Sequence, residues 1–121
     1  MEQKKTLVLG ASLKPIRYSY MAIKRLVQME QPVVAIGLKE GSVAGIAIQT
    51  GKPHFEAIDT ITLYINAQRQ PDYYDYLVGL QPKRVIFNPG TENPEFYKIL
   101  EAAGIEAESA CTLVLLSTNS Y

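Results

Sequence analysis

The chain has 121 residues, of which 47% are hydrophobic and 20% charged, and its 12 basic side chains balance its 12 acidic ones. The length fits a single domain over residues 1–121, and the composition is ordinary for a soluble globular protein. A net charge of zero excludes a global field that would draw the chain to nucleic acid or to a membrane surface, so any anion site must be local.

The single cysteine and the N-terminal residues indicate the compartment. Cys111 excludes an intramolecular disulfide framework and fits a reducing environment. The apolar run after Met1–Lys5 is too short for a signal peptide, and no stretch approaches the roughly 20 apolar residues of a transmembrane helix. We therefore expect a cytoplasmic protein.

Hydrophobic patterning in the first third of the chain predicts strand, helix and strand. Thr6–Leu9 is short and apolar, as expected for a strand covered on both faces. Apolar residues then recur at helical spacing from Tyr20, with Ser19 as the expected N-cap and Gln31-Pro32 as the end. Val33–Ile36 is the second buried strand.

The middle of the chain is less regular. Lys39–Gly45 has the composition of a turn, and Ile46–Ile48 is either a short extension or an edge strand. Pro53–Ala57 is a further connection, and Ile61–Ile65 is expected to be a third core strand. Pro71–Leu80 predicts a short helix with its proline in the first turn.

The last third predicts a strand, a helix and a short strand. Arg84–Phe87 is the first of these, and Asn93 is the expected N-cap of a helix that continues through Ala103 and ends at a glycine. Ile105–Glu108 is the final strand. Periodicity alone does not decide whether Thr112–Leu116 is strand or helix.

This alternation predicts an α/β fold with a mostly parallel sheet, right-handed crossovers and helices on both faces. Ligands of such sheets bind beyond the carboxyl ends of the strands, where the strand order reverses. That edge collects the turns after Leu9, Ile36, Ile65 and Phe87, which makes these turns the candidate site.

The turn after the first strand has the composition of an anion site. Gly10 lets the backbone turn sharply, and Ala11 and Ser12 leave room for a ligand. Backbone N–H groups at a helix start suit an anion, and Lys14 and Arg17 supply positive charge. A diphosphate cradle fits these residues, although their spacing departs from Gly-x-Gly-x-x-Gly. The simpler alternative is a plain turn with solvated cations.

The end of the second strand argues against NAD as the ligand. NAD sites of this class place Asp or Glu roughly 20 residues after the glycines, where it binds the ribose. Here Lys39 follows the strand, and it suits a ribose phosphate such as that of NADP or the 3′-phosphate of coenzyme A. Glu40 is close enough to keep NAD open.

Gly10-Ala11-Ser12, Lys14-Pro15, Arg17 and Ser19-Tyr20 together resemble the opening motif of the small CoA-binding-domain proteins. That family has a Rossmann-like three-layer fold related to the CoA-binding domain of succinyl-CoA synthetase. Residues 87–106 resemble a later family stretch, Gln-Pro-Gly followed by a helix, and Cys111 falls where the family often has a cysteine. The segment between Gly37 and Gly51 departs from the family pattern, because an Asn-Pro pair at the adenosine end is missing.

The resemblance implies binding of coenzyme A or a related nucleotide, without implying a reaction. It places Pro89 and Gly90 across the crevice from the first turn, and it implies a C-terminal helix over residues 109–119 capped by Ser109. The residues that it implies around the diphosphate are Gly10, Ala11, Ser12, Lys14, Pro15, Arg17 and Ser19.

No pair of residues predicts catalysis or a metal site. His54, the only histidine, lies far in sequence from Cys111, and the two do not form a metal-binding pattern. Cys111 fits a small buried hydrophobe, with a mixed disulfide to coenzyme A as the alternative. Glu92 and Glu95 fit a helix start, where acids are stabilising. We expect a binding protein rather than an enzyme.

Three tyrosines, Tyr73, Tyr74 and Tyr76, cannot all face one core from a short helix. Burial between subunits is favoured over contact with adenine, because tyrosine is enriched at interfaces. The resulting hypothesis is a small CoA-binding or acyl-CoA-binding protein that forms a homodimer. An NADP-linked enzyme and a ligand-free interaction module are the alternatives.

Overall fold

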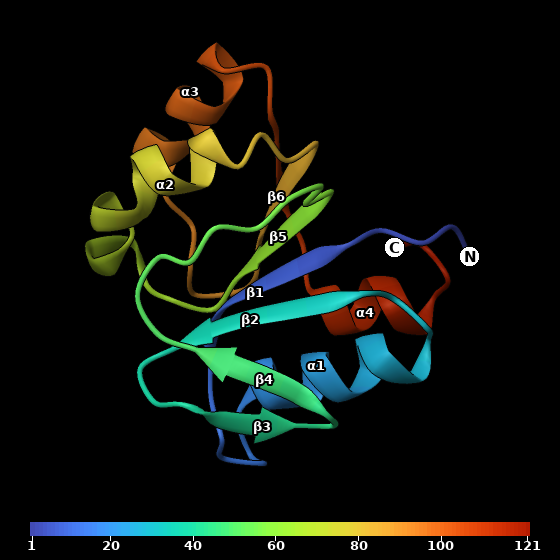
Figure 1. The fold of residues 1–121 in the computed structure, drawn as a ribbon. Coiled ribbons are helices and arrows are strands. Elements are labelled where there is room, and N and C mark those ends of the chain that lie inside the picture. Colours follow the sequence, from blue (N-terminus) through green and yellow to red (C-terminus); the bar gives the residue numbers. More distant parts are fainter.

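One seven-stranded sheet organises the computed structural model, which describes all 121 residues (Figure 1). The strands lie in the order β3-β4-β2-β1-β5-β6-β7, and every neighbouring pair is parallel except β3 with β4. The predicted α/β fold with a mostly parallel sheet is confirmed. The strands are β1 (Thr6–Ala11), β2 (Val33–Gly37), β3 (Gly41–Val43), β4 (Ile46–Gln49), β5 (Thr60–Leu63), β6 (Arg84–Phe87) and β7 (Glu106–Ser109).

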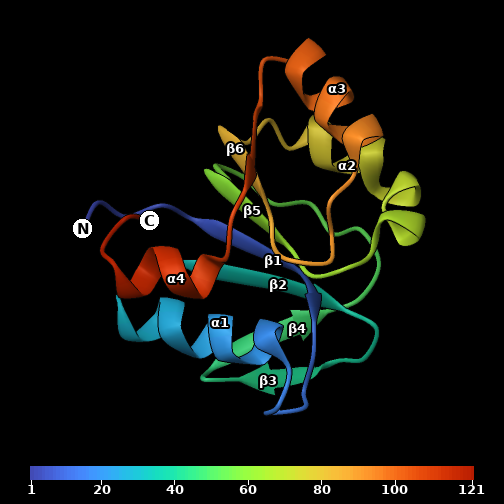
Figure 2. The same cartoon turned by 180° about the vertical axis from the view of Figure 1, so that it is seen from behind.

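Helices cover both faces of this sheet. Figures 1 and 2 show α1 and α4 together on one face and α2 and α3 on the other. None of these helices has the length and hydrophobicity required to span a bilayer. The α-helices are α1 (Tyr18–Gln28), α2 (Tyr74–Gly79), α3 (Pro94–Ala102) and α4 (Thr112–Ser117), and two 3₁₀ turns, η1 (Ala67–Arg69) and η2 (Pro71–Tyr73), precede α2.

The central strands are apolar because they contribute to two cores. Successive side chains of a strand point to opposite faces, so Leu7 and Leu9 of β1 join the core under α2 and α3, whereas Val8 joins the core under α1 and α4. Phe87 and Phe96 meet edge to face, with ring centroids 5.7 Å apart, in the first of these cores. Burial on both faces is what the continuous apolar runs predict.

The prediction that Ser19 caps the first helix is wrong. Tyr18 begins α1, and the N-cap is Arg17, whose backbone is extended at φ −77° and ψ 142°. Met21 N donates to Arg17 O at 3.2 Å, so Ser19 already lies inside the first turn, where it is buried. A cap residue needs an extended backbone ahead of the helix, and Ser19 does not have one.

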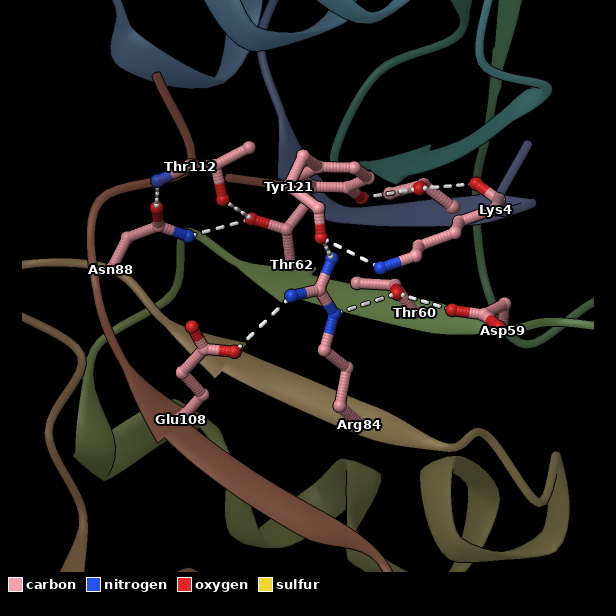
Figure 3. A network of polar contacts seen from close by, with 10 residues as sticks. Lys4, Asp59, Thr60, Thr62, Arg84, Asn88, Glu108, Thr112 and Tyr121 are labelled. Atoms are coloured by element: carbon pink, nitrogen blue, oxygen red, sulfur yellow. Dashed lines mark hydrogen bonds and ion pairs between the residues drawn. The ribbon is translucent and has the colours of Figure 1, made fainter. Parts of the chain in front are cut away.

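The C-terminal helix is shorter than expected and Ser109 does not cap it. Ser109 ends β7, where it pairs with Phe87, and α4 begins at Thr112. Its first N–H groups find a distant partner: Thr112 N donates to Asn88 Oδ1 at 2.9 Å (Figure 3). Asn88 Nδ2 in turn donates to Thr62 Oγ1 at 2.7 Å. A side chain at the end of β6 therefore supplies the cap.

Two irregular segments differ from their predictions. The turn expected over Lys39–Gly45 contains β3, which forms an antiparallel hairpin with β4 and buries Val43. The helix expected over Pro71–Leu80 divides into η2 and α2. The hairpin depends on pairing of β3 with β4, which the periodicity of so short a strand does not reveal. The second segment is helical from Pro71 to Gly79, with a 3₁₀ first turn.

Asn93 is the N-cap of α3, as predicted, and its Oδ1 accepts from Phe96 N at 3.3 Å. The helix ends at Ala102, one residue earlier than expected, with Ala103 as its C-cap. Gly104 follows with φ +75°, in the left-handed region that glycine adopts without strain.

A buried polar network joins the chain ends to the amino-terminal side of the sheet (Figure 3). Arg84, the first residue of β6, donates from Nε to Thr60 Oγ1 at 3.0 Å, from Nη1 to Glu108 Oε1 at 3.1 Å and from Nη2 to Tyr121 O at 2.8 Å. Lys4 Nζ donates to the same Tyr121 oxygen at 2.7 Å. The two ends of the chain therefore lie side by side, and the Arg84 side chain links them to β6.

Candidate functional site

A cleft of ≈ 690 Å³ lies at the carboxyl ends of the central strands. The strand order reverses there, because β2 and β4 extend from one side of β1 while β5, β6 and β7 extend from the other. The turns after β1, β2, β5 and β6 line the cleft, as the fold class predicts. The polar and small residues that line it are Gly10, Ala11, Ser12, Lys14, Arg17, Ser19, Gly37, Lys39, Asn66, Arg69, Gly90 and Thr91.

Two glycines make the floor of this cleft possible. Gly10 has φ +95°, and a Cβ on it would lie 2.9 Å from Ile65 Cγ2. A Cβ on Gly37 would collide with the carbonyl oxygen of Ala11. The register between β1 and β2 shifts between Leu9 and Ala11, so Gly10 is the extra residue of a bulge. The close approach of neighbouring chain segments therefore excludes a Cβ from both positions.

The turn from Ser12 to Arg17 is organised by its own hydrogen bonds. Ser12 Oγ accepts from Lys14 N at 3.1 Å, and Arg17 N donates to Lys14 O at 3.0 Å. The side chains of Lys14 and Arg17 are exposed, whereas Ser19 is buried at the base of α1. Pro15 lies in this turn but does not line the cleft. The other nine predicted site residues all line it.

The charge of the cleft is entirely positive. Its lining contains four cations, Lys14, Arg17, Lys39 and Arg69, and no Asp or Glu. The protein's ion pairs are His54–Glu56, Lys83–Asp59 and Arg84–Glu108, so none of the four cations has a carboxylate partner. A protein of zero net charge thus has a locally cationic cleft, which attracts an anion.

The wall opposite the first turn combines the loops after β5 and β6. Pro89 and Gly90 lie there as predicted, and Asn66, Arg69 and Tyr73 join them. Asn66 and Arg69 were not predicted as cleft residues, and for Tyr73 a subunit interface was favoured over contact with adenine. The available signal was their position after a core strand, at the edge where the ligand of such a sheet binds.

A buried amide holds this wall together. Gln70 is fully buried, and its Nε2 donates to Ile65 O at 3.0 Å and to Thr91 O at 2.7 Å. Asn93 Nδ2 donates to Gln70 Oε1 at 2.9 Å. Ile65 and Thr91 both line the cleft, so one side chain ties the two loops to each other.

Tyr64 is a half-buried titratable group of the cleft. Burial raises its pKa to about 12, against the opposing effect of hydrogen bonds with Thr62 and Thr112. The phenol is therefore neutral at physiological pH and acts as a hydrogen-bonding group. Cys111 lies near enough to contribute to this pKa but does not line the cleft.

The remaining candidates for chemistry have other partners. His54 Nε2 lies 3.6 Å from Glu56 Oε1 in an exposed loop and forms no hydrogen bond with Cys111. Glu92 accepts from Gly90 N at 2.8 Å, and Glu95 accepts from Tyr74 OH at 3.0 Å. No group of three His, Cys, Asp or Glu side chains is arranged to hold a metal ion.

The predicted tyrosine cluster makes contacts within the chain. Tyr74 stacks on Phe96 with ring centroids 4.4 Å apart, and Tyr76 OH donates to Pro53 O at 2.6 Å. Tyr73 lines the cleft, and Lys52 Nζ lies 5.4 Å from its ring centroid. All three tyrosines are only half-buried, so each keeps an accessible edge.

The sheet order, the covering helices and the cleft over the first turn define a Rossmann-like α/β domain. The chain belongs to the CoA binding domain family, whose sequence pattern matches residues 4–117. Among the curated proteins, none matches this chain.

Solved structures share this fold over the whole chain. An uncharacterized protein of known structure is 47% identical, with a TM-score of 0.97 and full coverage of both chains. A Thermus thermophilus protein is 21% identical with a TM-score of 0.86, covering 98% of this chain and 91% of its own. A hypothetical protein from Pyrococcus horikoshii OT3 is 23% identical with a TM-score of 0.86, covering 96% and 83%.

Proposed function

We propose that the protein binds coenzyme A, or an acyl-CoA, in the cleft at the carboxyl ends of β1, β2, β5 and β6. The observation that carries the proposal is a cleft with four unpaired cations and no acid, in a chain of the CoA binding domain family. A polyanionic nucleotide is the ligand class that matches this charge. The proposal assigns binding and assigns no reaction.

The fold suggests the direction in which the ligand lies. In sheets of this type the diphosphate sits at the turn after the first strand, and the adenosine ribose sits at the end of the second. Gly10, Ala11, Ser12, Lys14 and Arg17 would then face the diphosphate, with Ser19 below and Pro15 shaping the turn. Lys39 would face the 3′-phosphate, and the pantetheine arm would pass Pro89 and Gly90.

A thermal-shift panel with CoA, dephospho-CoA, acetyl-CoA, NAD, NADP and ATP tests the proposal. Ligand at 100 times its Kd stabilises a protein by roughly 2.7 kcal/mol, which is readily measured. We expect CoA to stabilise more than NAD, because Lys39 rather than an acid follows β2. Equal or greater stabilisation by NAD would overturn the proposal, and a preference for NADP would support an NADP-linked enzyme.

The substitution Ser12→Leu tests the location of the site. A leucine at the floor of the turn should abolish CoA binding by filling the space, while the free energy of unfolding changes by only about 0.5 kcal/mol, because the hydrogen bond lost with Ser12 Oγ is exposed. Ser117→Leu, on the exposed end of α4, is the matched control and should bind CoA normally. Normal binding by the Ser12 variant would place the ligand elsewhere.

We also propose a homodimer in the cytoplasm. The half-buried edges of Tyr73, Tyr74 and Tyr76 support an interface between subunits, since tyrosine is enriched at such surfaces. The single free cysteine is compatible with a reducing compartment. Sedimentation at high micromolar concentration tests the assembly, and a strict monomer would remove it.

A further inference from the structure

The four cations of the cleft lie on two sides of the first strand. Lys14 and Arg17 belong to the turn after β1, and Lys39 follows β2. Arg69 follows β5, which flanks β1 on the other side. At the ordinary spacing of about 4.8 Å per strand, β2 and β5 are roughly 10 Å apart. Lys39 and Arg69 therefore extend into the cleft from opposite sides of β1.

The backbone of Arg69 is held firmly at the cleft. Arg69 is the last residue of η1, and its N–H donates to Asn66 Oδ1 at 3.1 Å. The next residue, Gln70, is fully buried and bonded to Ile65 O and Thr91 O. Because the backbone is already ordered by these hydrogen bonds, less conformational entropy is lost when the Arg69 side chain binds a ligand.

The guanidinium of Arg69 has no partner in the protein. It forms no ion pair, and its only hydrogen bonds are those of the backbone. Asp72, three residues further on, forms no ion pair with it, and the Asp72 carbonyl accepts from Lys52 Nζ. The side chain is exposed and lines the cleft, so its five N–H donors are free for a ligand.

The chemistry of the pantetheine arm of CoA indicates which group Arg69 would bind, and this step rests on the proposed function. The diphosphate and the 3′-phosphate of CoA account for Lys14, Arg17 and Lys39, on and beside the first turn. The pantetheine arm, directed toward β5 and β6, contains amides and a hydroxyl but no charge. With the ligand in this orientation, the anion placed to meet Arg69 is one carried by the acyl group.

We propose that the protein prefers a carboxyacyl-CoA, a thioester of a dicarboxylic acid, and that Arg69 binds its free carboxylate. The planar guanidinium donates two parallel hydrogen bonds to a carboxylate, which gives this pair both strength and direction. Arg69 is thus a specificity-determining residue for the acyl group, and the side-chain amide of Asn66, which also lines the cleft, suits the amides of the arm.

Titration calorimetry with length-matched acyl groups tests the inference. The ligands are malonyl-CoA against propionyl-CoA, succinyl-CoA against butyryl-CoA, and free CoA. We expect the wild-type protein to bind the carboxylated member of at least one pair tenfold tighter or more. Arg69→Gln should abolish that preference, and it should weaken the carboxylated thioester at least tenfold more than it weakens CoA and the neutral thioesters.

Arg25→Gln is the matched control, because Arg25 is exposed on α1 outside the cleft. It should retain the full preference. Equal affinity within both pairs for the wild-type protein would overturn the inference while leaving the proposed function intact. An equal loss for all ligands in Arg69→Gln would also overturn it, since Arg69 would then bind a phosphate. Absence of CoA binding by the wild-type protein would remove both proposals.

Discussion

Two arginines at opposite ends of the parallel strands show how this protein uses the same side chain in two ways. Arg84, at the amino end of β6, is buried, with all three guanidinium nitrogens bonded and the ring of Tyr121 4.5 Å away (Figure 3). Arg17, at the carboxyl end of β1, is exposed and its guanidinium bonds to nothing in the protein. A satisfied cation stabilises the fold, whereas an unsatisfied one at a cleft is available to a ligand.

The largest expected effect on stability comes from replacing Arg84, the arginine whose guanidinium is fully hydrogen-bonded. Arg84→Met should lower the free energy of unfolding by about 3 kcal/mol, because removing one partner of a buried ion pair costs roughly 3–5 kcal/mol and Glu108 is only partly buried. Urea denaturation measures the change. Arg17→Met is the control and should leave stability within about 0.5 kcal/mol. Equal stabilities for the two variants would refute the contrast.

Alkaline pH should weaken the fold through two phenols, the half-buried Tyr64 at the cleft and the buried Tyr121 at the opposite ends of the strands. Burial raises the pKa of Tyr64 from 10.0 to about 12, and it also raises the pKa of Tyr121. The unfolded chain ionises first, so this stability is fully present below pH 10 and is lost as the pH rises toward 12. For Tyr64 the loss is on the order of 2 kcal/mol.

Urea unfolding at pH 9 and pH 11.5 measures this effect. Tyr64→Phe should be less sensitive to the change of pH than the wild-type protein, because the ionising group is gone. Tyr18→Phe, which alters an exposed tyrosine, is the control and should keep the wild-type pH dependence. If Tyr64→Phe lost as much stability as the wild-type protein between these pH values, the phenol would not be the cause.

Replacing Arg17, whose guanidinium has no partner in the protein, should weaken ligand binding without changing the stability of the fold. Arg17→Ala should weaken CoA by about 1.5–3 kcal/mol, the range for a charged hydrogen bond, with a larger loss at low salt. Dephospho-CoA should lose the same amount, because it retains the diphosphate. Calorimetry with both ligands is the measurement, and unchanged affinity would mean that this turn does not hold the diphosphate.

The smallest effect expected concerns Lys39. Lys39→Ala should weaken CoA by about 1 kcal/mol, since Lys39 is an exposed cation facing one phosphate. Dephospho-CoA lacks that phosphate and should bind the variant and the wild-type protein equally. The same calorimetric series decides this. A loss shared by both ligands would assign Lys39 to the diphosphate instead.

Local patterns in the sequence determined much of the fold. The apolar runs of β1, β2, β5 and β6 predicted buried strands, and Asn93 with Pro94 predicted the start of α3, because caps and periodicity depend on near neighbours in the chain. The carboxyl edge of a parallel sheet is also a property of the fold class, which is why the first turn and Lys39 were predicted to lie together.

Tertiary structure alone decided the polar contacts between distant segments. Asn88 caps α4 across 24 residues, Gln70 joins two loops by bonding to Thr91 across 21, and Arg84 reaches Tyr121 across 37. No local signal marks such pairs, since a buried polar group is satisfied by whichever element packs against it. For Arg69 the position after a core strand indicated the correct end of the sheet, but only the folded chain decided that its side chain lines the cavity without a partner.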